Sequence, residues 1–385
     1  MQDVIIVGGS VAGLTTAIKI LEVNPRKDVL ILESRPQVGQ KACSGGISAW
    51  LIDDLIQQLD IPQLKDAIVS RIRKVKLVSP GGTEVVVDGE AIKIDPLGYV
   101  FDREKFDGTL ANVARGLGAS IITSSKVKGY SDIQNASFTV MTDTMNYHTK
   151  YLVGADGVFS IIGKQSGLIP PTDRGDIHTA VEHFLERPES EPDEQITLRF
   201  DERYAPGGYT WHFPHGNDII KIGCGVPISI GHPNEYLEKY ISKYFPLCKR
   251  IKTIGGCLPT AKPLPKSVRG NIALVGDASF QCDSLTGGDI ATGMGCACIL
   301  GETIAKDRPL TEYDSLWRKS IGKLLHRRYK LKKMLYSLKQ GEIDDIADTL
   351  AGYQVKSANP RREITKGLLH VLMRHPKILW RYWRA

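Results

Sequence analysis

The sequence lacks the cysteine patterns that bind metals or build disulfide frameworks. It contains no CxxC pair and no cluster of Cys and His at the spacing of zinc ligands. Its seven cysteines are scattered between Cys43 and Cys298. An odd, unpatterned set fits the reducing cytosol better than a secreted scaffold. We therefore expect a cytoplasmic protein without a metal site.

Long apolar stretches are missing as well. No segment approaches about 18 uninterrupted apolar residues, so the sequence predicts no membrane-spanning helix. The first apolar run, Val4–Val7, opens onto glycines as a buried strand would, so we expect no signal peptide. The composition, with 42% hydrophobic and 24% charged residues, is that of a globular protein.

Positive charge is concentrated toward the C-terminal end. From Leu316 onward there are 17 Lys or Arg and 5 acidic residues, against a net charge of +7 for the whole sequence. Such a tail indicates an anionic partner, either nucleic acid or a membrane surface, unless it is a solvated helix. In Gly367–Arg374 and Ile378–Arg384, arginines are interleaved with tryptophan and other large apolar residues. This favours peripheral contact with an anionic membrane, and we expect no nucleic-acid partner.

The first 33 residues have the order of a dinucleotide-binding unit. Asp3–Val7 predicts a buried parallel strand, the turn GGSVAG follows, and Leu14–Leu21 has the period of an amphipathic helix. A second strand, Val29–Leu32, ends at Glu33. Strand, glycine turn, helix, strand and an acid about 20 residues on form the dinucleotide fingerprint, although a plain βα turn is the alternative.

Each part of this turn has an expected task. Gly8 permits the tight turn, Gly13 lets the helix pack closely on the strand, and Glu33 accepts hydrogen bonds from ribose hydroxyls. The helix N-terminus offers N–H groups to a pyrophosphate. Ser10 stands where the fingerprint has its middle glycine, and a small side chain still allows close approach. The turn alone does not separate FAD from NAD.

Two later segments point to FAD. Tyr151–Gly157 (YLVGADG) resembles the GADG motif of flavoprotein hydroxylases and their relatives, and Asn271–Asp277 (NIALVGD) resembles their GDA motif. In both, an apolar strand ends at a Gly-Asp corner whose carboxylate could reach a cofactor hydroxyl. For either motif alone, an aspartate that caps the next helix is the alternative. By resemblance, Asp277 would contact the ribityl chain, Arg103 would lie along FAD, and the backbone of Val127 would meet the adenine.

The stretch between these motifs alternates in period two. Ile196–Phe200 and Ile219–Gly225 predict half-buried antiparallel strands, which Glu84–Val87 would join in a sheet over the flavin. From Thr311 onward the pattern is helical. The sequence thus predicts an α/β protein with a Rossmann-like FAD-binding domain, an inserted antiparallel-sheet substrate domain and a C-terminal helical segment. The expected boundaries are 1–75, 96–170 and 269–310 for the FAD-binding domain, 76–95 and 171–268 for the substrate domain, and 311–385 for the helical region.

One strand of the substrate half carries a row of aromatic residues. In PGGYTWHFP, alternation places Tyr209, Trp211 and Phe213 on one face and His212 on the other. Such a row is more often core than ligand surface. However, PxxYxWxFP is the pattern of the geranylgeranyl reductase family, flavoproteins that saturate prenyl double bonds, and the sequence resembles it at every fixed position.

Two further segments support the same resemblance. Gly39–Gly46 is similar to the Lys-x-Cys-x-Gly segment of that family, which places its cysteine near the flavin. Leu285–Gly288 is similar to the turn whose amides and following helix face the pyrimidine end of the flavin. The sequence departs from the pattern at Ser284, Asp289 and Lys164, where proline, glycine and arginine are usual. The cofactor-binding residues we expect are Gly8, Ser10, Val11, Ala12, Gly13, Glu33, Lys41, Cys43, Ser44, Gly45, Arg103, Val127, Asp156, Gly157, Gly276, Asp277, Gly287, Gly288, Asp289 and Ile290.

The resemblance implies an FAD-dependent reductase of carbon–carbon double bonds in geranylgeranyl chains, acting on membrane-lipid precursors. An isolated alkene needs a hydride on one carbon and a proton on the other, in a dry apolar site. We expect Cys43 to supply or relay the proton, although a buried inert thiol is the alternative. Tyr209, Trp211 and Phe213 would line the pocket, and Tyr209 and Trp211 would take part in catalysis.

Two other functions remain open on the sequence. An FAD-dependent monooxygenase that hydroxylates an aromatic or lipid shares the three cofactor motifs, and a flavin-binding electron carrier is a third possibility. No second glycine fingerprint for a nicotinamide and no iron–sulfur cysteine pattern occur in the sequence. The reductant would therefore be external, either NADPH or a ferredoxin-type protein.

Overall fold

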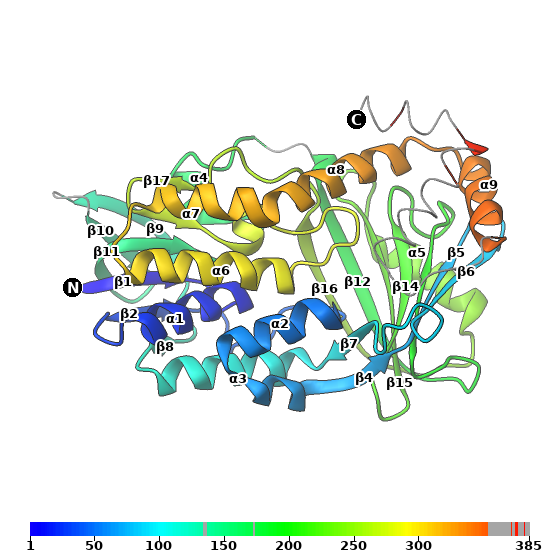
Figure 1. The fold of residues 1–385 in the computed structure, drawn as a ribbon, viewed down its shortest axis with the longest axis horizontal. Helices are drawn as coiled ribbons and strands as arrows, with labels where there is room; N and C mark the ends of the chain where they lie inside the picture. The colour runs from blue at the N-terminus through cyan, green and yellow to red at the C-terminus, as the bar shows by residue number, and fades with distance from the viewer. Residues whose placement is uncertain (134–136, 172–173, 353–370, 372–373, 376–380, 382–385) are drawn as a thin grey trace.

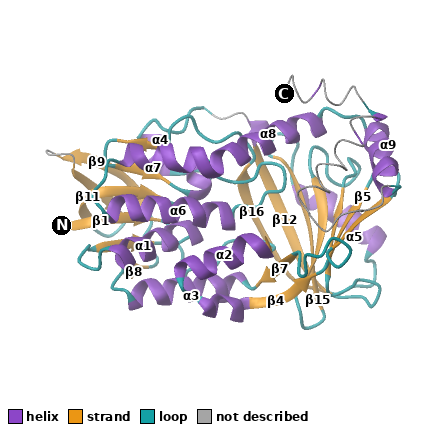
Figure 2. Ribbon diagram, in the orientation of Figure 1, coloured by secondary structure: helices purple, strands orange, loops and turns teal. Residues whose placement is uncertain are grey.

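The computed structural model describes residues 1–133, 137–171, 174–352, 371, 374–375 and 381. Within these residues the chain is a mixed α/β structure, which confirms the predicted fold class. Two large sheets lie at opposite ends of the view, and the helices α1, α2, α3 and α6 lie along the first of them (Figures 1 and 2).

The first sheet is built around parallel strands. All four residues of β2 and the last four of β1 are buried, as expected for parallel strands covered on both faces. Strand β1 pairs in parallel with β2 and β11, which confirms the predicted βαβ order. The sheet runs β17 (Val268–Arg269), β18 (Ile272–Leu274), β11 (Asn146–Gly154), β1 (Gln2–Val7), β2 (Val29–Leu32) and β8 (Ser120–Ile122), with β9 (Val127–Ile133) and β10 (Ser137–Thr142) joined through β11.

Helix α1 (Val11–Val23) differs from its expected pattern. The sequence predicts an amphipathic helix, but this is wrong, since ten of its 13 residues are buried. The reason is that α1 packs against α3 (Arg103–Gly116) and α6 (Ile290–Ala305) as well as against the sheet. A short helix, α4 (Ile161–Gln165), follows β11.

The second sheet carries the aromatic strand. Its order is β16 (Arg250–Pro259), β12 (Ile177–Glu186), β15 (Ile219–Pro227), β14 (Tyr209–Pro214), β13 (Gln195–Arg199), β5 (Lys74–Val78) and β6 (Glu84–Asp88). Glu84–Val87 joins this sheet as predicted. The expectation of antiparallel pairing is correct except between β5 and β13, which run parallel. These two strands are more than a hundred residues apart, so no local turn sets their direction. Helix α5 (Pro233–Tyr244) packs against β12 and β15.

A small third sheet connects the two large ones. It consists of β3 (Gly46–Ser48), β7 (Gly98–Phe101) and β4 (Ile68–Ile72). Helix α2 (Ala49–Leu59) packs against β3 and β7. Of the 3-10 turns in the described residues, η1 (Pro62–Ala67) precedes β4, η2 (Arg174–Asp176) precedes β12 and η3 (Gly276–Ser279) follows β18.

The C-terminal part is helical as far as the structure describes it, which confirms the prediction from Thr311 onward. It comprises α7 (Leu310–Trp317), the π-helical turn η4 (Arg318–Gly322), α8 (Lys323–Tyr336) and α9 (Gln340–Ala351). The consecutive elements α7, η4 and α8 together run from the first sheet to the second (Figure 1). The predicted membrane segments Gly367–Arg374 and Ile378–Arg384 lie almost wholly outside the described residues. The division into domains stays a prediction.

Candidate functional site

A cavity of about 650 Å³, which we call the outer cavity, opens at the carboxyl ends of β1 and β2. This is where open α/β sheets bind their ligands. Most of the predicted cofactor residues line it. They are Gly8, Ser10, Val11, Ala12, Glu33, Lys41, Arg103, Val127, Asp156, Gly157, Gly276, Asp277, Asp289 and Ile290.

The glycine turn leaves no room for side chains at two positions. Gly8 has a φ of +107°, and a Cβ there would lie 2.4 Å from the carbonyl oxygen of Ala155. A Cβ on Gly13 would lie 2.2 Å from the carbonyl oxygen of Gly8, so this position also requires glycine, although Gly13 itself does not line the cavity. Ser10 is the N-cap of α1, because its Oγ accepts a hydrogen bond from the Gly13 N–H and donates one to Ala155. Serine at this position thus begins the helix.

Glu33 fixes the shape of the turn from the neighbouring strand. One carboxylate oxygen accepts a hydrogen bond of 2.8 Å from the backbone N–H of Gly9, and the other accepts one of 2.8 Å from Arg35. The carboxylate therefore lies at the rim of the outer cavity. Its expected contact with a ribose stays a prediction.

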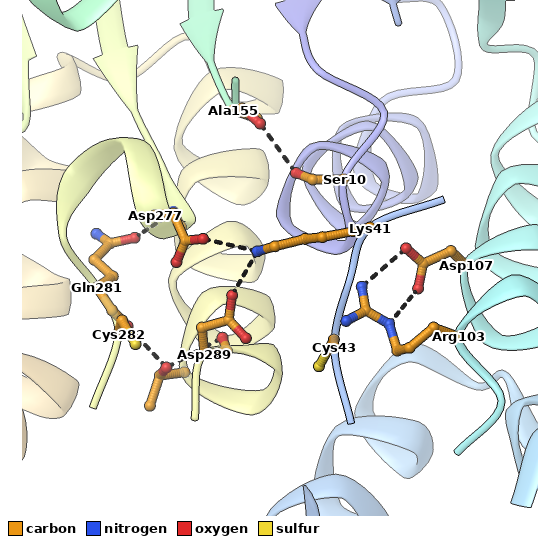
Figure 3. A network of polar contacts seen from close by, with 12 residues as sticks. Ser10, Lys41, Cys43, Arg103, Asp107, Ala155, Asp277, Gln281, Cys282 and Asp289 are labelled. Atoms are coloured by element: carbon orange, nitrogen blue, oxygen red, sulfur yellow. Dashed lines mark hydrogen bonds and ion pairs between the residues drawn. The ribbon is translucent and has the colours of Figure 1, made fainter. Parts of the chain in front are cut away.

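Lys41 forms ion pairs with two aspartates in the wall of the outer cavity. Its ammonium lies 2.7 Å from Oδ2 of Asp277 and 2.8 Å from Oδ2 of Asp289, as Figure 3 shows. Although burial alone would lower it, the two carboxylates raise the pKa of Lys41. Burial raises the pKa of Asp277 despite Lys41, whereas Lys41 and Arg103 outweigh burial and lower the pKa of Asp289. Asp289, a departure from the family pattern, thus provides the second anionic partner of Lys41.

Arg103 occupies the opposite wall. It is buried and makes a bidentate ion pair with Asp107 one helical turn later, with two hydrogen bonds of 2.9 Å (Figure 3). Although burial alone would lower the pKa of Arg103, Asp107 raises it, so the guanidinium stays charged. A fixed positive charge therefore faces the cavity.

Three buried polar atoms of residues at this cavity have no hydrogen-bond partner among the described residues. They are Oδ1 of Asp277, one terminal nitrogen of Arg103 and Oγ of Ser125. An acceptor and a donor, together with the N-terminus of the 13-residue helix α1, suit a ligand that has both hydroxyl groups and an anionic pyrophosphate. The chain's own residues therefore fit FAD.

The two Gly-Asp corners have different environments. The carboxylate of Asp156 accepts hydrogen bonds from the Ser160 hydroxyl and from the N–H of Ile161, at 2.7 Å, so it caps α4. This is the alternative that the sequence left open for either motif. Asp277 makes no such cap and keeps one oxygen free for a ligand.

A second cavity, which we call the inner cavity, lies under the aromatic strand. The two cavities share Lys41, Ala42, Gly255, Gly256, Cys257, Asp289 and Ile290, so they meet at Lys41. The inner cavity also contains the remaining predicted residues, namely Cys43, Ser44, Gly45, Tyr209, Trp211, Phe213, Gly287 and Gly288. His212 faces away and packs against Tyr240 and Phe245, as alternation predicts.

Two glycines leave the space that the aromatic rings of Trp211 and Phe213 occupy. A Cβ on Gly223 would lie 2.1 Å from the Trp211 ring, and a Cβ on Gly46 would lie 2.3 Å from the Phe213 ring. Tyr209 is fixed at its other end, where its hydroxyl donates a hydrogen bond of 2.5 Å to the carbonyl oxygen of Thr286. The rings therefore form one continuous wall of the inner cavity.

Cys43 lies on the segment that enters the inner cavity from Lys41. It is half-buried, and its sulfur accepts a hydrogen bond from the Gly45 N–H at 3.4 Å. Arg103 and Lys221 lie close enough to interact electrostatically with it. Figure 3 shows Cys43 beside the Arg103 guanidinium. The thiol is therefore bordered by positive charge at the junction of the two cavities.

Sequence reasoning missed two charged residues here, Glu182 and Lys221. Glu182 lines the inner cavity and is only 3% exposed, and Lys221 is 2% exposed. Each stands in an alternating strand pattern that indicates a strand but not which face is inward. A lysine inside the apolar run Ile219–Gly225 was the one signal that could have drawn attention to this site.

Metal binding has no support among the residues described. No group of three or more His, Cys, Asp or Glu side chains there could hold an ion. Likewise, no helix in the described ranges is long and apolar enough to cross a membrane.

Comparison with known proteins gives one consistent family. Residues 176–258 match the geranylgeranyl reductase catalytic domain. The chain is 29% identical to a digeranylgeranylglycerophospholipid reductase of Methanothrix thermoacetophila, with 98% of this chain and 97% of that protein covered. It is 30% identical, with the same coverage, to digeranylgeranylglycerophospholipid reductase 2 of Methanothermobacter thermautotrophicus.

Solved structures share the fold. A geranylgeranyl bacteriochlorophyll reductase-like protein from Thermoplasma acidophilum superposes with a TM-score of 0.86 at 22% identity, covering 98% of this chain and 97% of that one. The p-nitrophenol 4-monooxygenase of Pseudomonas putida has a TM-score of 0.76 at 14% identity, covering 96% of this chain and 98% of that one. At these identities the likeness concerns the fold alone.

Proposed function

This chain belongs to the digeranylgeranylglycerophospholipid reductase family, and we propose that it saturates the carbon–carbon double bonds of geranylgeranyl chains in a membrane-lipid precursor. It is an FAD-dependent oxidoreductase. The observation that carries the proposal is the meeting of two cavities at Lys41, one with polar groups suited to FAD and the other walled by aromatic rings.

The outer cavity would hold the cofactor. The N-terminus of α1 would bind the pyrophosphate, Oδ1 of Asp277 would accept a hydrogen bond from a hydroxyl, and the free nitrogen of Arg103 would donate one. Bound and reduced, FAD would supply the hydride for one carbon of the double bond. The residues of the inner cavity would bind the prenyl chain and supply the proton.

The inner cavity would bind the prenyl chain and provide the proton. Tyr209, Trp211 and Phe213 give an apolar wall that excludes water from the reacting carbons. Cys43, at the junction of the cavities, would donate its thiol proton to the second carbon. The volume of this cavity, about 180 Å³, is below the roughly 300–1,000 Å³ that encloses a whole ligand. It would therefore hold the segment being reduced while the rest of the lipid extends outward.

Anaerobic mixing of the reduced enzyme with a geranylgeranyl lipid tests this function. We expect the flavin spectrum to return to its oxidised form, and the lipid to gain mass in steps of two hydrogens. Absorbance and mass spectrometry measure the two results. A flavin that stays reduced with every geranylgeranyl lipid offered would contradict the proposal.

The hydroxylase alternative is less well supported. A monooxygenase would add one oxygen to the lipid and only in air, which the same mass measurement detects. The fold is shared with monooxygenases, but the matched catalytic domain and the curated relatives are reductases. The external reductant, NADPH or a ferredoxin-type protein, is a further part of the proposal, since the sequence carries no fingerprint for a second dinucleotide.

Contact with a membrane surface also belongs to the proposal. Tyr336 at the end of α8 lines the inner cavity and is 38% exposed, so the cavity reaches the surface there. One stripe along α7 to α8 combines exposed Leu316 and Leu324 with exposed Lys319, Lys323 and Arg327. Basic and apolar residues together suit an anionic bilayer that carries the lipid substrate.

Reversing the charge of this stripe should abolish binding to anionic vesicles. With Lys319, Lys323 and Arg327 all replaced by glutamate, we expect the affinity to fall about a hundred-fold or more, because each basic residue near the surface contributes about 1 kcal/mol. Sedimentation with vesicles of anionic and neutral lipids measures this. The matched control replaces exposed Arg115, Lys128 and Lys249 by glutamate. If both triple variants bind equally well, the contact does not involve this stripe.

A further inference from the structure

The sheet face that carries the aromatic wall also carries a buried acid, Glu182, and a buried base, Lys221. In the sheet register, Trp211 lies opposite Gly223 and Gly223 lies opposite Glu182, so the three form a row across β14, β15 and β12. Phe213, Lys221 and Phe184 form the next row on the same face. Both charged residues therefore lie on the face of the sheet that carries Trp211 and Phe213, and Glu182 lines the inner cavity.

The glycine between them makes the first contact possible. The indole of Trp211 reaches over Gly223, and its N–H donates a hydrogen bond of 2.7 Å to Oε2 of Glu182. Any side chain at position 223 would occupy the space of the ring. The row thus connects the aromatic wall directly to a carboxylate.

A second contact connects Glu182 to the cysteine segment. The hydroxyl of Ser44, the residue after Cys43, donates a short hydrogen bond to the same oxygen, Oε2. The other oxygen, Oε1, is buried and has no hydrogen-bond partner among the described residues. Two donors thus hold Oε2 in place, whereas Oε1 keeps an open position.

Lys221 completes the group from the adjacent strand. Its ammonium donates a hydrogen bond of 3.2 Å to the carbonyl oxygen of Ser44. Burial lowers the pKa of Lys221, and Glu182, Cys43 and Asp102 only partly offset this. Its proton is therefore held less firmly than that of an exposed lysine.

Burying Glu182 and Lys221 at this position destabilises the folded protein. A buried charge costs several kcal/mol of desolvation, and an apolar pair would serve equally well if packing were the only need. A wall that must remain apolar for a prenyl chain is the last place where such residues are expected without a function. Buried titratable groups of this kind indicate a chemical role.

We propose that Glu182, through the hydroxyl of Ser44, returns a proton to Cys43 after each reduction, and that Lys221 returns the proton to Glu182. This inference rests on the proposed function. When the thiol S–H bond of Cys43 breaks and a C–H bond forms on the lipid, a thiolate remains. At rest the Ser44 hydroxyl donates a hydrogen bond to Oε2 of Glu182. To pass a proton on, this hydroxyl turns to the sulfur of Cys43, gives the sulfur its proton and takes the proton of Glu182 in exchange. The carboxylate then regains a proton from Lys221, which lies close enough to interact electrostatically with it and is resupplied by solvent. Each reduced bond therefore consumes one solvent proton and the hydride of the reduced flavin.

Two substitutions at Glu182 separate this role from a purely structural one. Glu182→Gln keeps an acceptor for Trp211 and Ser44 but carries no transferable proton, whereas Glu182→Asp carries one on a shorter side chain. With repeated turnover by geranylgeranyl lipid, we expect Glu182→Gln to be slower by about 10²–10⁴-fold. Glu182→Asp should be intermediate. The lipid affinity and FAD content of both should stay close to those of the unaltered protein.

Glu186→Gln is the matched control, because Glu186 lies on the same strand, is exposed and lines neither cavity. It should turn over at the unaltered rate. A Glu182→Gln enzyme at the unaltered rate, or a Glu182→Asp enzyme no faster than Glu182→Gln, would overturn the inference. The second result would mean that Glu182 only holds Trp211.

If Glu182→Gln does not fold, Ser44→Ala replaces it, and an unaltered rate for that enzyme overturns the relay equally. An unaltered protein that the lipid never reoxidises would refute the reductase function instead.

Discussion

Replacing Cys43 with alanine should slow reoxidation of the reduced enzyme by a geranylgeranyl lipid by about 10²–10⁴-fold. The reason is that this thiol, at the junction of the two cavities, is the proposed donor of the proton to the second carbon. Stopped-flow absorbance of the flavin under anaerobic conditions measures the rate. Cys43→Ser should be slow as well, because a hydroxyl is a much weaker acid than a thiol.

The FAD content and lipid affinity of these variants should change little, since the site loses only a small group. Cys248→Ala is the control, because Cys248 is a half-buried thiol like Cys43 but lines neither cavity. It should react at the normal rate. If the Cys43→Ala enzyme turns over as fast as the unaltered protein, the thiol is an inert part of the wall.

Replacing Trp211 with alanine should act mainly on lipid binding. The indole is half-buried and forms the centre of the aromatic wall, so its loss removes apolar surface from the lipid. Burial of a large apolar side chain contributes about 1.5–3 kcal/mol, which corresponds to roughly a ten- to hundred-fold weaker affinity. Titration of the oxidised protein with a geranylgeranyl lipid, followed by flavin absorbance, measures this.

Two further substitutions separate a loss of lipid contact from a loss of protein stability. Trp211→Phe keeps an aromatic ring but loses the N–H bond to Glu182, so its lipid affinity should fall less. Phe245→Ala removes a core ring on the far face of the sheet and should cost about 3–5 kcal/mol of unfolding free energy while leaving lipid affinity unchanged. A Trp211→Ala protein that loses FAD or fails to fold would identify the aromatic wall as structural.

Much of the cofactor half follows from residues that are neighbours in the chain. A short apolar run, a glycine turn and a helical period determine β1, the turn and α1, because steric limits and periodicity act over a few residues. The same is true of the aromatic row, since alternation alone places Tyr209, Trp211 and Phe213 on one face.

Local patterns did not separate residues whose roles depend on distant partners. Asp156 and Asp277 follow similar strands, but the partner of the first, Ser160, is four positions away, whereas the partner of the second, Lys41, is 236 positions away and is placed only by the fold. Lys41 and Asp289 are 248 positions apart, so no spacing rule predicts their ion pair. The parallel pairing of β5 with β13 was missed for the same reason.

The sequence by itself determined the dinucleotide turn, the fold class and the aromatic face of one strand. Only the tertiary structure decided that Glu182 and Lys221 share one face of the sheet with Trp211. The physical reason is that alternation defines two faces of a strand but does not say which one is inward. That choice depends on the register with neighbouring strands, and here β15 aligns Gly223 between Trp211 and Glu182 and so brings an acid to the aromatic wall.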